Sequence, residues 1–271
     1  MDYLKYYQLA EHPFSNVVDR RFYYNSAQQF EALTKLKYAV DTRKGLAVVI
    51  GNIGAGKTTL ARRVLEELDE DNYEAALIVI IHSSVSSEWL LKKFAIQLGV
   101  KHVPDNKVEL LGEIYRRLHE INEQGRKAVV LMDEVQMLKS REIMEEFRGL
   151  LNMETGDGKM VNFIFFGLPD LDQVLSLDEP LKQRVAIRIR LTAYSEENTK
   201  DYISHRLHVA GCNNDIFTDK AISLIYYYSN GVPRLINTIC DNALLEGFLF
   251  KHPAVDESII KTVAIDLGLE N

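Results

Sequence analysis

The segment from Gly51 to Thr58 constrains the fold of this chain more than any other part of it. It reads Gly-Asn-Ile-Gly-Ala-Gly-Lys-Thr and matches the phosphate-loop pattern G-x-x-x-x-G-K-S/T at every fixed position. The apolar run Leu46–Ile50 comes directly before it, and a segment with helical spacing of apolar residues follows. A strand, a glycine-rich loop and a helix in this order predict a phosphate-binding loop at the end of a buried strand in an α/β fold.

The residue types of this loop suit the binding of a nucleoside triphosphate. Its glycines let the backbone wrap around phosphates, and the N–H groups of the loop and of the following helix then face the anion. Lys57 is expected to reach the β- and γ-phosphates, and the Thr58 hydroxyl is expected to bind Mg²⁺. The predicted ATP-binding residues are Gly51, Asn52, Ile53, Gly54, Ala55, Gly56, Lys57, Thr58 and Thr59.

Two adjacent carboxylates form a second candidate site. Asp133 and Glu134 directly follow the apolar run Ala128–Met132. A carboxylate at the carboxyl end of such a strand lies where ligands bind in open α/β sheets. We expect Asp133 to hold Mg²⁺ together with Thr58, and Glu134 to orient and activate the attacking water. The alternative, that the pair only ends a strand, is weakened by the complete phosphate loop upstream.

Short apolar runs alternate with helical patterns over the first two thirds of the chain. The runs are Leu46–Ile50, Ala75–Ile81, Ala128–Met132, Val161–Phe166 and Val185–Leu191. The first four are nearly all apolar, as strands buried on both faces of a parallel sheet are, whereas the last alternates and predicts an edge strand. Together these features predict an αβα sandwich of the P-loop NTPase class. The inserted-strand topology usual for P-loop enzymes with a glutamate after the aspartate gives the expected strand order 5-1-4-3-2.

Helical patterns replace the strand pattern from about Ser195 onward. They begin near Glu196 and cover 218–229, 234–246 and 256–267. We therefore predict an αβα nucleotide-binding core over residues 1–194, with an N-terminal linker at 1–25, and a small helical lid over 195–271.

Composition limits the class of partner and the compartment. Lys and Arg total 32 and Asp and Glu total 39, for a formal net charge of −7, the wrong sign for a chain held on nucleic acid mainly by phosphate neutralisation. The longest apolar run, Ala75–Ile81, is far shorter than the ~20 residues that cross a bilayer, and the N-terminus lacks a signal-peptide layout. Cys212 and Cys240 predict small buried side chains rather than a disulfide framework. A cytoplasmic location is expected.

Several further motifs resemble AAA+ ATPases, and in particular the ATPase domain of the general secretion pathway protein A family. The similarity runs from end to end of the chain. The matching residues are Pro13-Phe14-Ser15, Asp19, Arg21-Phe22, Arg43-Lys44-Gly45, Asp133-Glu134-Val135-Gln136, Gly167-Leu168-Pro169-Asp170-Leu171, Leu181-Lys182-Gln183-Arg184 and Gly231-Val232-Pro233-Arg234-Leu235-Ile236-Asn237. The phosphate loop is common to a vast superfamily, whereas the Gly-x-Pro-Arg-x-Ile-Asn stretch and the Pro-Phe opening are far more particular.

The resemblance implies roles for two arginines. Arg234 matches the sensor-2 arginine, which the lid carries onto the γ-phosphate; the alternative is a lid arginine paired with a carboxylate such as Asp241. Arg184 matches the arginine finger, which reaches the nucleotide of a neighbouring subunit; the alternative is a surface residue at the sheet edge. Both are therefore candidate catalytic residues beside Glu134.

The chain also departs from the family pattern. Family members usually carry a polar sensor-1 side chain after Gly167, but this chain has Leu168, and Asn162, the nearest polar residue on that strand, sits at the wrong end. Hydrolysis is therefore expected to be slow or to need a partner. The family typically continues into a membrane span and a peptidoglycan-binding region, whereas this chain ends at Asn271, as a stand-alone relative or a truncated form would.

Two interpretations remain open for several other residues. Phe14, Phe22 and Tyr24 either flank the adenine or pack in a core. Basic pairs on separate predicted helices either cover exposed faces or, if they converge, form a nucleic-acid track. These pairs are Arg62-Arg63, Lys92-Lys93 and Arg116-Arg117.

The leading functional hypothesis is an Mg²⁺-dependent ATPase that forms a homo-oligomeric ring or filament with ATP. By the resemblance, its protein partner would be a secretion or type IV pilus-like machine of the cell envelope, and the chain would be peripheral to the inner membrane. The alternative is a DNA-binding AAA+ transposition regulator of the TnsC/MuB type. A third reading is a switch that binds ATP but hardly hydrolyses it.

Overall fold

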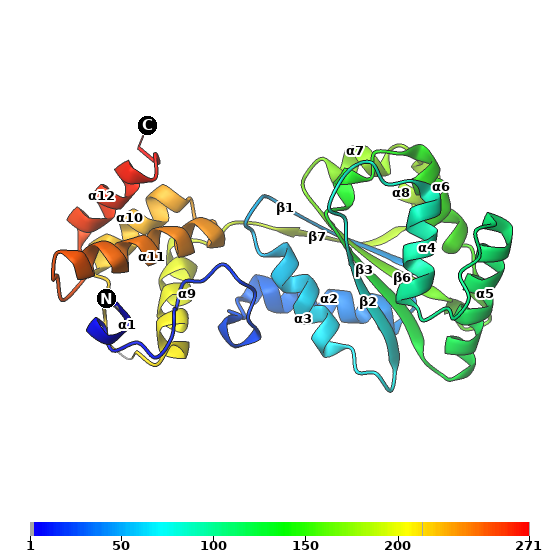
Figure 1. Cartoon of the computed structure of the whole chain (residues 1–271), viewed down its shortest axis with the longest axis horizontal. Coiled ribbons are helices and arrows are strands. Elements are labelled where there is room, and N and C mark those ends of the chain that lie inside the picture. The colour runs from blue at the N-terminus through cyan, green and yellow to red at the C-terminus, as the bar shows by residue number, and fades with distance from the viewer. Residues whose placement is uncertain (1–2, 213, 271) are drawn as a thin grey trace. The chain divides into compact units, whose positions relative to one another are not determined.

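The computed structural model describes residues 3–212 and 214–270, which form two compact units (Figure 1). One unit consists of Gln28–Ile53 and Lys57–Leu191 and contains the main sheet. The other consists of residues 3–27, Gly54–Gly56 and the chain from Thr192 onward, and is helical. Within the described residues, no helix combines the length and the apolar character that a bilayer crossing requires.

The main sheet confirms the predicted topology. Its strands are β1 (Leu46–Gly51), β2 (Tyr73–Val79), β3 (Lys127–Asp133), β6 (Val161–Gly167) and β7 (Val185–Leu191). All pair in parallel, in the order β2-β3-β6-β1-β7. Counting only the strands of this sheet along the chain, the order is 2-3-4-1-5, which is 5-1-4-3-2 from the other edge. A separate short hairpin is formed by β4 (Glu154–Thr155) and β5 (Gly158–Lys159).

Helices cover both faces of this sheet, as a sandwich requires (Figure 1). One face packs against the helices α4 (Ser87–Gln97), α5 (Lys107–Glu123), α6 (Arg141–Leu150), α7 (Leu171–Leu175) and α8 (Glu179–Lys182). The opposite face is covered by α2 (Ala27–Asp41) and α3 (Lys57–Glu67). The central strands β1, β3 and β6 are buried almost throughout, which explains their nearly continuous apolar sequences.

β2 is less buried than its apolar sequence predicted, although its position at the edge is the one that the predicted strand order gives it. β2 lies at an edge of the sheet, and the side chain of Val79 at its end is 46% exposed. Ile81, two residues further on, is 79% exposed. An apolar run does not reveal how completely the faces of a strand are covered, because that depends on the packing of distant segments. The expectation of an edge position for β7 is confirmed, and its burial alternates accordingly.

The helical unit joins the two ends of the described chain. Its helices are α1 (Tyr3–Tyr6), the short 3-10 helix η1 (Arg20–Phe22), α9 (Glu196–Val209), α10 (Asp219–Ser229), α11 (Pro233–Leu249) and α12 (Glu257–Asp266). Tyr7, Leu9, Phe14 and Phe22 belong to the same buried apolar cluster as the inner faces of α9 to α12. The N-terminal segment therefore groups with the helical unit, not with the αβα unit to which the sequence analysis attached it, because its apolar side chains complete that core.

One buried arginine ties the N-terminal segment to α9. The guanidinium of Arg206, which is 5% exposed, donates to the backbone oxygen of Pro13 and, at 2.9 Å, to that of Ser15. It also donates to the Tyr202 hydroxyl at 2.7 Å and lies 4.8 Å from the centre of the Phe22 ring. Its charge is thus buried among acceptors and ring faces, which is how a guanidinium is accommodated inside a protein. The predicted buried cysteines, Cys212 and Cys240, lie in the same core.

Candidate functional site

The phosphate loop connects the end of β1 to the start of α3, as predicted. Gly54 and Gly56 have φ angles of 77° and 90°, in the left-handed region that favours glycine. Lys57 is buried, and its ammonium group donates to the backbone oxygens of Gly51 at 2.8 Å and Asn52 at 3.0 Å. The lysine side chain therefore folds back over its own loop, which holds a positive charge at the first turn of α3.

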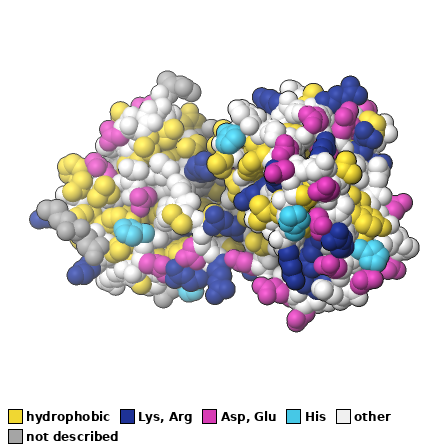
Figure 2. All heavy atoms as spheres, turned by 45° about the vertical axis from the view of Figure 1, so that its right-hand side comes forward, with side chains coloured by type: hydrophobic (Ala, Val, Ile, Leu, Met, Phe, Trp, Pro, Cys, Tyr) yellow, Lys and Arg dark blue, Asp and Glu magenta, His cyan; other side chains and the backbone are white. Residues whose placement is uncertain are grey.

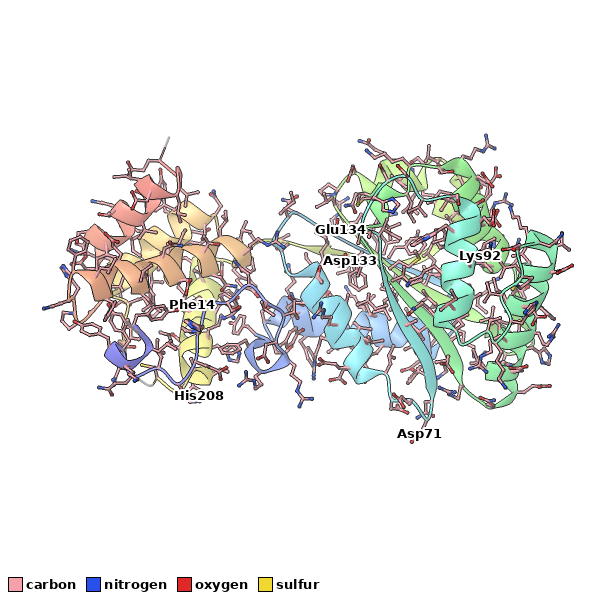
Figure 3. The ribbon with its side chains drawn as sticks, viewed as in Figure 1. Phe14, Asp71, Lys92, Asp133, Glu134 and His208 are labelled. Atoms are coloured by element: carbon pink, nitrogen blue, oxygen red, sulfur yellow. The ribbon has the colours of Figure 1, made fainter. Side chains whose placement is uncertain are left out.

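The carboxylate of Asp133 reaches this first turn directly. Thr58 donates its hydroxyl hydrogen bond to Asp133 Oδ2 at 2.6 Å, although β6 separates the strands that precede the two residues. Asp133 is 1% exposed, and burial raises the pKa of its carboxyl, while hydrogen bonds from the Thr58 hydroxyl and the Glu134 N–H act in the opposite direction. A hydroxyl and a carboxylate oxygen are ligands that Mg²⁺ prefers, so this pair fits the predicted metal site. Figure 3 shows Asp133 and Glu134 together at the end of β3.

The second carboxylate, Glu134, is held by Gln136, for which the sequence predicted no role of its own beyond its place in the Asp133-Glu134-Val135-Gln136 motif. The Glu134 backbone is left-handed, with φ 61° and ψ 34°, and the short 3-10 helix η2 (Val135–Met137) follows it. Gln136 donates its side-chain N–H to Glu134 Oε2 at 2.5 Å, and its Oε1 accepts from the backbone N–H of Leu168 at 3.1 Å. A polar residue between the buried Val135 and Leu138 is the sequence signal that could have drawn attention to it.

The carboxyl end of β6 lacks a polar side chain, as the sequence indicated. Leu168 follows the last residue of β6, and only its backbone offers a hydrogen bond at this point. Asn162 lies near the amino end of the same strand, where its Oδ1 accepts from the Gly45 N–H at 3.1 Å. Asn162 therefore lies at the opposite end of the strand from Leu168 and does not replace the polar side chain that is absent there.

Arg184 lies at the amino-terminal end of the strands, directly before β7. The register of β1 and β7 pairs Leu46 with Val185 and Gly51 with Leu191, so Arg184 and the phosphate loop are at opposite ends of these strands. The guanidinium donates to Asn152 Oδ1 at 2.5 Å and to the Arg148 backbone oxygen at 3.4 Å. In this position Arg184 cannot contact a nucleotide on its own phosphate loop, so a catalytic role requires another subunit.

Arg234 is the second residue of α11 in the helical unit and is exposed. Gly54 belongs to the same unit, and a Cβ atom added to it would lie 2.8 Å from Arg234 Cβ and 3.0 Å from Val232 Cγ1. This close approach gives a reason for glycine at this loop position. Asp241, the carboxylate considered as an alternative partner for Arg234, accepts a hydrogen bond from the Tyr3 hydroxyl at 2.7 Å.

The aromatic residues considered for adenine contact are packed in the helical unit. Phe14 is 1% exposed and meets Phe217 edge to face at 5.9 Å between ring centres (Phe14 is labelled in Figure 3). Phe22 is buried in the same cluster, and Tyr24 packs edge-on against Tyr194 at 5.7 Å. These contacts favour the core interpretation for all three residues.

The basic pairs on the αβα unit are interspersed with carboxylates. Figure 2 shows Lys and Arg side chains mixed with Asp and Glu on the face it presents. One or both members of each pair form ion pairs: Arg63 with Glu66 and Glu67, Lys92 with Glu88 and Asp105, Arg116 with Glu113, and Arg117 with Glu74 and Glu120. This arrangement favours solvated helix faces over a continuous nucleic-acid track.

Residues 40–175 match the AAA domain family. Among characterised proteins, general secretion pathway protein A of Aeromonas hydrophila is 34% identical to this chain over 249 residues. The aligned region covers 91% of this chain and 45% of that protein, so the chain spans less than half of the relative's length.

Solved structures support the fold assignment. The ORC2 protein of Aeropyrum pernix, in ADPNP–ADP complexes, superimposes with a TM-score of 0.71 at 15% identity, over 94% of this chain and 71% of that one. The RuvB Holliday junction branch migration motor of Thermotoga maritima gives a TM-score of 0.60 at 18% identity, over 92% and 74%. At such identities these structures are evidence for the shared fold alone.

Proposed function

We propose that this chain, which belongs to the AAA domain family, binds ATP with Mg²⁺ and hydrolyses it. The observation that carries the proposal is the 2.6 Å hydrogen bond from Thr58 to Asp133, with Glu134 as the next residue. It brings the helix that follows the phosphate loop together with the strand that ends in two carboxylates. ATPase chemistry needs these groups at one place.

Each group has a distinct task in this reaction. Lys57 and the loop N–H groups bind the β- and γ-phosphates, and Thr58 and Asp133 would hold Mg²⁺. The bound metal ion would neutralise charge on the phosphate oxygens. Glu134 accepts a proton from the attacking water and orients it toward the γ-phosphorus. Asp133 has no such role, because its oxygens are engaged by the Thr58 hydroxyl and the Glu134 N–H.

The proposal includes a site shared between subunits. Arg184 lies at the end of the strands opposite its own phosphate loop, so we assign it to the nucleotide of a neighbour in a ring or filament. Arg234 is assigned to the γ-phosphate of its own subunit on the strength of its motif.

Similarity to general secretion pathway protein A supports a biological setting. We assign the chain to the assembly of a secretion or pilus-like machine, acting at the inner face of a membrane through a protein partner. The net charge of −7 and the ion-paired basic residues favour this setting over the DNA-binding transposition regulator.

The test measures phosphate release from ATP by the purified chain, with Mg²⁺ or with EDTA, and with or without duplex DNA at several salt concentrations. We expect the rate of phosphate release to require Mg²⁺ and to be the same with and without DNA. DNA binding that tightens with ATP and weakens with salt would favour the alternative function, and ATP binding with no turnover would favour the switch.

A further inference from the structure

Gln136 connects two parts of the αβα unit that are distant in sequence. Its amide uses both of its polar atoms: the nitrogen donates to Glu134 Oε2 at 2.5 Å, and the oxygen accepts from the Leu168 N–H at 3.1 Å. Glu134 follows β3, and Leu168 follows the neighbouring strand β6. The position at which the sensor-1 side chain is missing is thereby linked to the carboxylate assigned as the base.

The orientation of this amide is fixed by its partners. A carboxylate can only accept and a backbone N–H can only donate, so exchanging the nitrogen and oxygen of Gln136 would break both hydrogen bonds. Gln136 is 6% exposed, so unmet hydrogen bonds here would cost free energy. A Cβ at Gly167 would lie only 2.9 Å from Gln136 Oε1, so glycine before Leu168 allows the amide to come this close to the end of β6.

We propose that Gln136 is a positioning residue that holds the Glu134 carboxylate in the orientation needed to activate water. Two observations favour a productive orientation of the Glu134 carboxylate. The left-handed backbone at Glu134 confines the start of its side chain, and the Gln136 N–H fixes the far end. Leu168 offers no polar side chain, and Gln136 provides a buried amide beside it. The inference rests on the proposed function, because it concerns the geometry of the same hydrolytic step.

The consequence is a defect confined to the chemical step. Loss of the amide should leave the phosphate loop and the Thr58–Asp133 pair intact, while the carboxylate samples unproductive orientations. Misplacement of a reacting group by about 1 Å can cost up to about a hundredfold in rate. We expect kcat to fall roughly tenfold or more, with KM for ATP changed less than twofold.

The experiment compares Gln136→Met, which keeps the length of the side chain but forms neither hydrogen bond, with wild type. Gln173→Met is the matched control, because Gln173 is exposed on α7. Gly167→Ala supplies a second perturbation that leaves the glutamine itself unchanged, since its methyl group would press on the Gln136 oxygen and on the Leu171 side chain, and its melting temperature reports any general effect of the second contact. Steady-state kcat and KM, the affinity for a fluorescent ATP analogue and the melting temperature are measured for each protein.

A double variant separates positioning from a general structural role. If Gln136 acts through Glu134, the Glu134→Gln/Gln136→Met protein should be no slower than Glu134→Gln alone. Full turnover in Gln136→Met, faster turnover, or a slowdown that persists unchanged without Glu134 would overturn the inference while leaving the ATPase proposal in place. Wild-type turnover that does not depend on Glu134 would overturn the proposed function and the inference together.

Discussion

The Thr58 hydroxyl lies 2.6 Å from Asp133 Oδ2, across the carboxyl end of β6. Neither residue could reach the other if the two preceding strands were on different sheets or ran in opposite directions. The inserted position of β6 also places Leu168 between the phosphate loop and the carboxylates, beside the site proposed for hydrolysis.

Removal of the loop lysine should abolish tight ATP binding. Lys57→Ala takes away the buried ammonium group, and hydrogen bonds to charged partners contribute about 1.5–3 kcal/mol each. The dissociation constant for ATP is expected to rise at least tenfold, as measured by calorimetric titration. Lys101→Ala, which removes an exposed lysine, is the control. Wild-type affinity in Lys57→Ala would contradict the assignment of the loop.

Replacement of the proposed base should separate binding from turnover. Glu134→Gln keeps the size and polarity of the side chain but cannot accept the proton, so turnover should fall by ~10²-fold or more, the usual scale for loss of a general base. ATP affinity should stay within about twofold, because the phosphate contacts are untouched. Glu123→Gln, at an exposed position on α5, controls for the change of charge. A fully active Glu134→Gln protein would remove this residue from the mechanism.

A polar side chain at the end of β6 should accelerate hydrolysis. Leu168→Gln restores the residue type that the family usually carries, and Leu168 is only partly buried, which leaves room for an amide. Basal turnover is expected to rise, as measured by phosphate release at saturating ATP. Unchanged turnover in a variant with a wild-type melting temperature would mean that another group places the water.

Arg184, at the end of the strands opposite the phosphate loop, should act on a neighbouring subunit. Specific activity is expected to rise with protein concentration, since an arginine supplied in trans can accelerate phosphoryl transfer by ~10³–10⁵. Arg184→Ala should bind ATP normally yet remain slow at every concentration. Mixing it with Lys57→Ala should recover turnover, because mixed interfaces pair an intact phosphate loop with an intact arginine. Concentration-independent activity together with a fully active Arg184→Ala protein would leave a monomeric ATPase.

The arginine that ties the N-terminal segment to α9 should matter for stability rather than for chemistry. Arg206→Met leaves the backbone oxygens of Pro13 and Ser15 without their donor. The free energy of unfolding of the helical unit is expected to fall by roughly 2–4 kcal/mol, which denaturant titration would measure. Arg62→Met, at an exposed position on α3, should change it by less than about 0.5 kcal/mol. Equal stability of the two variants would contradict the structural role.

Local patterns account for the parts that sequence reasoning predicted. The phosphate loop is contiguous in sequence. The strand order was predicted from the topology that is usual for P-loop enzymes with a glutamate after the aspartate. The incomplete burial of β2 and the docking of Phe14 depend on partners far along the chain, so no local pattern revealed them. Gln136 was quoted in a motif, but its link to Leu168 exists only because β3 and β6 are neighbours.

The attachment of residues 3–27 to the helical unit has a consequence for biosynthesis. Ser15 and Arg206 are separated by 191 positions, and the whole of the main sheet lies between them in sequence. At a ribosomal rate of ~5–20 residues per second, the N-terminal segment waits roughly 10–40 s before its partner helices are made. During that time Phe14 and Tyr7 have no native core to enter, while the sheet can already form. Nascent chains should therefore present an aromatic, chaperone-accessible segment over residues 3–27 until α9 to α12 emerge.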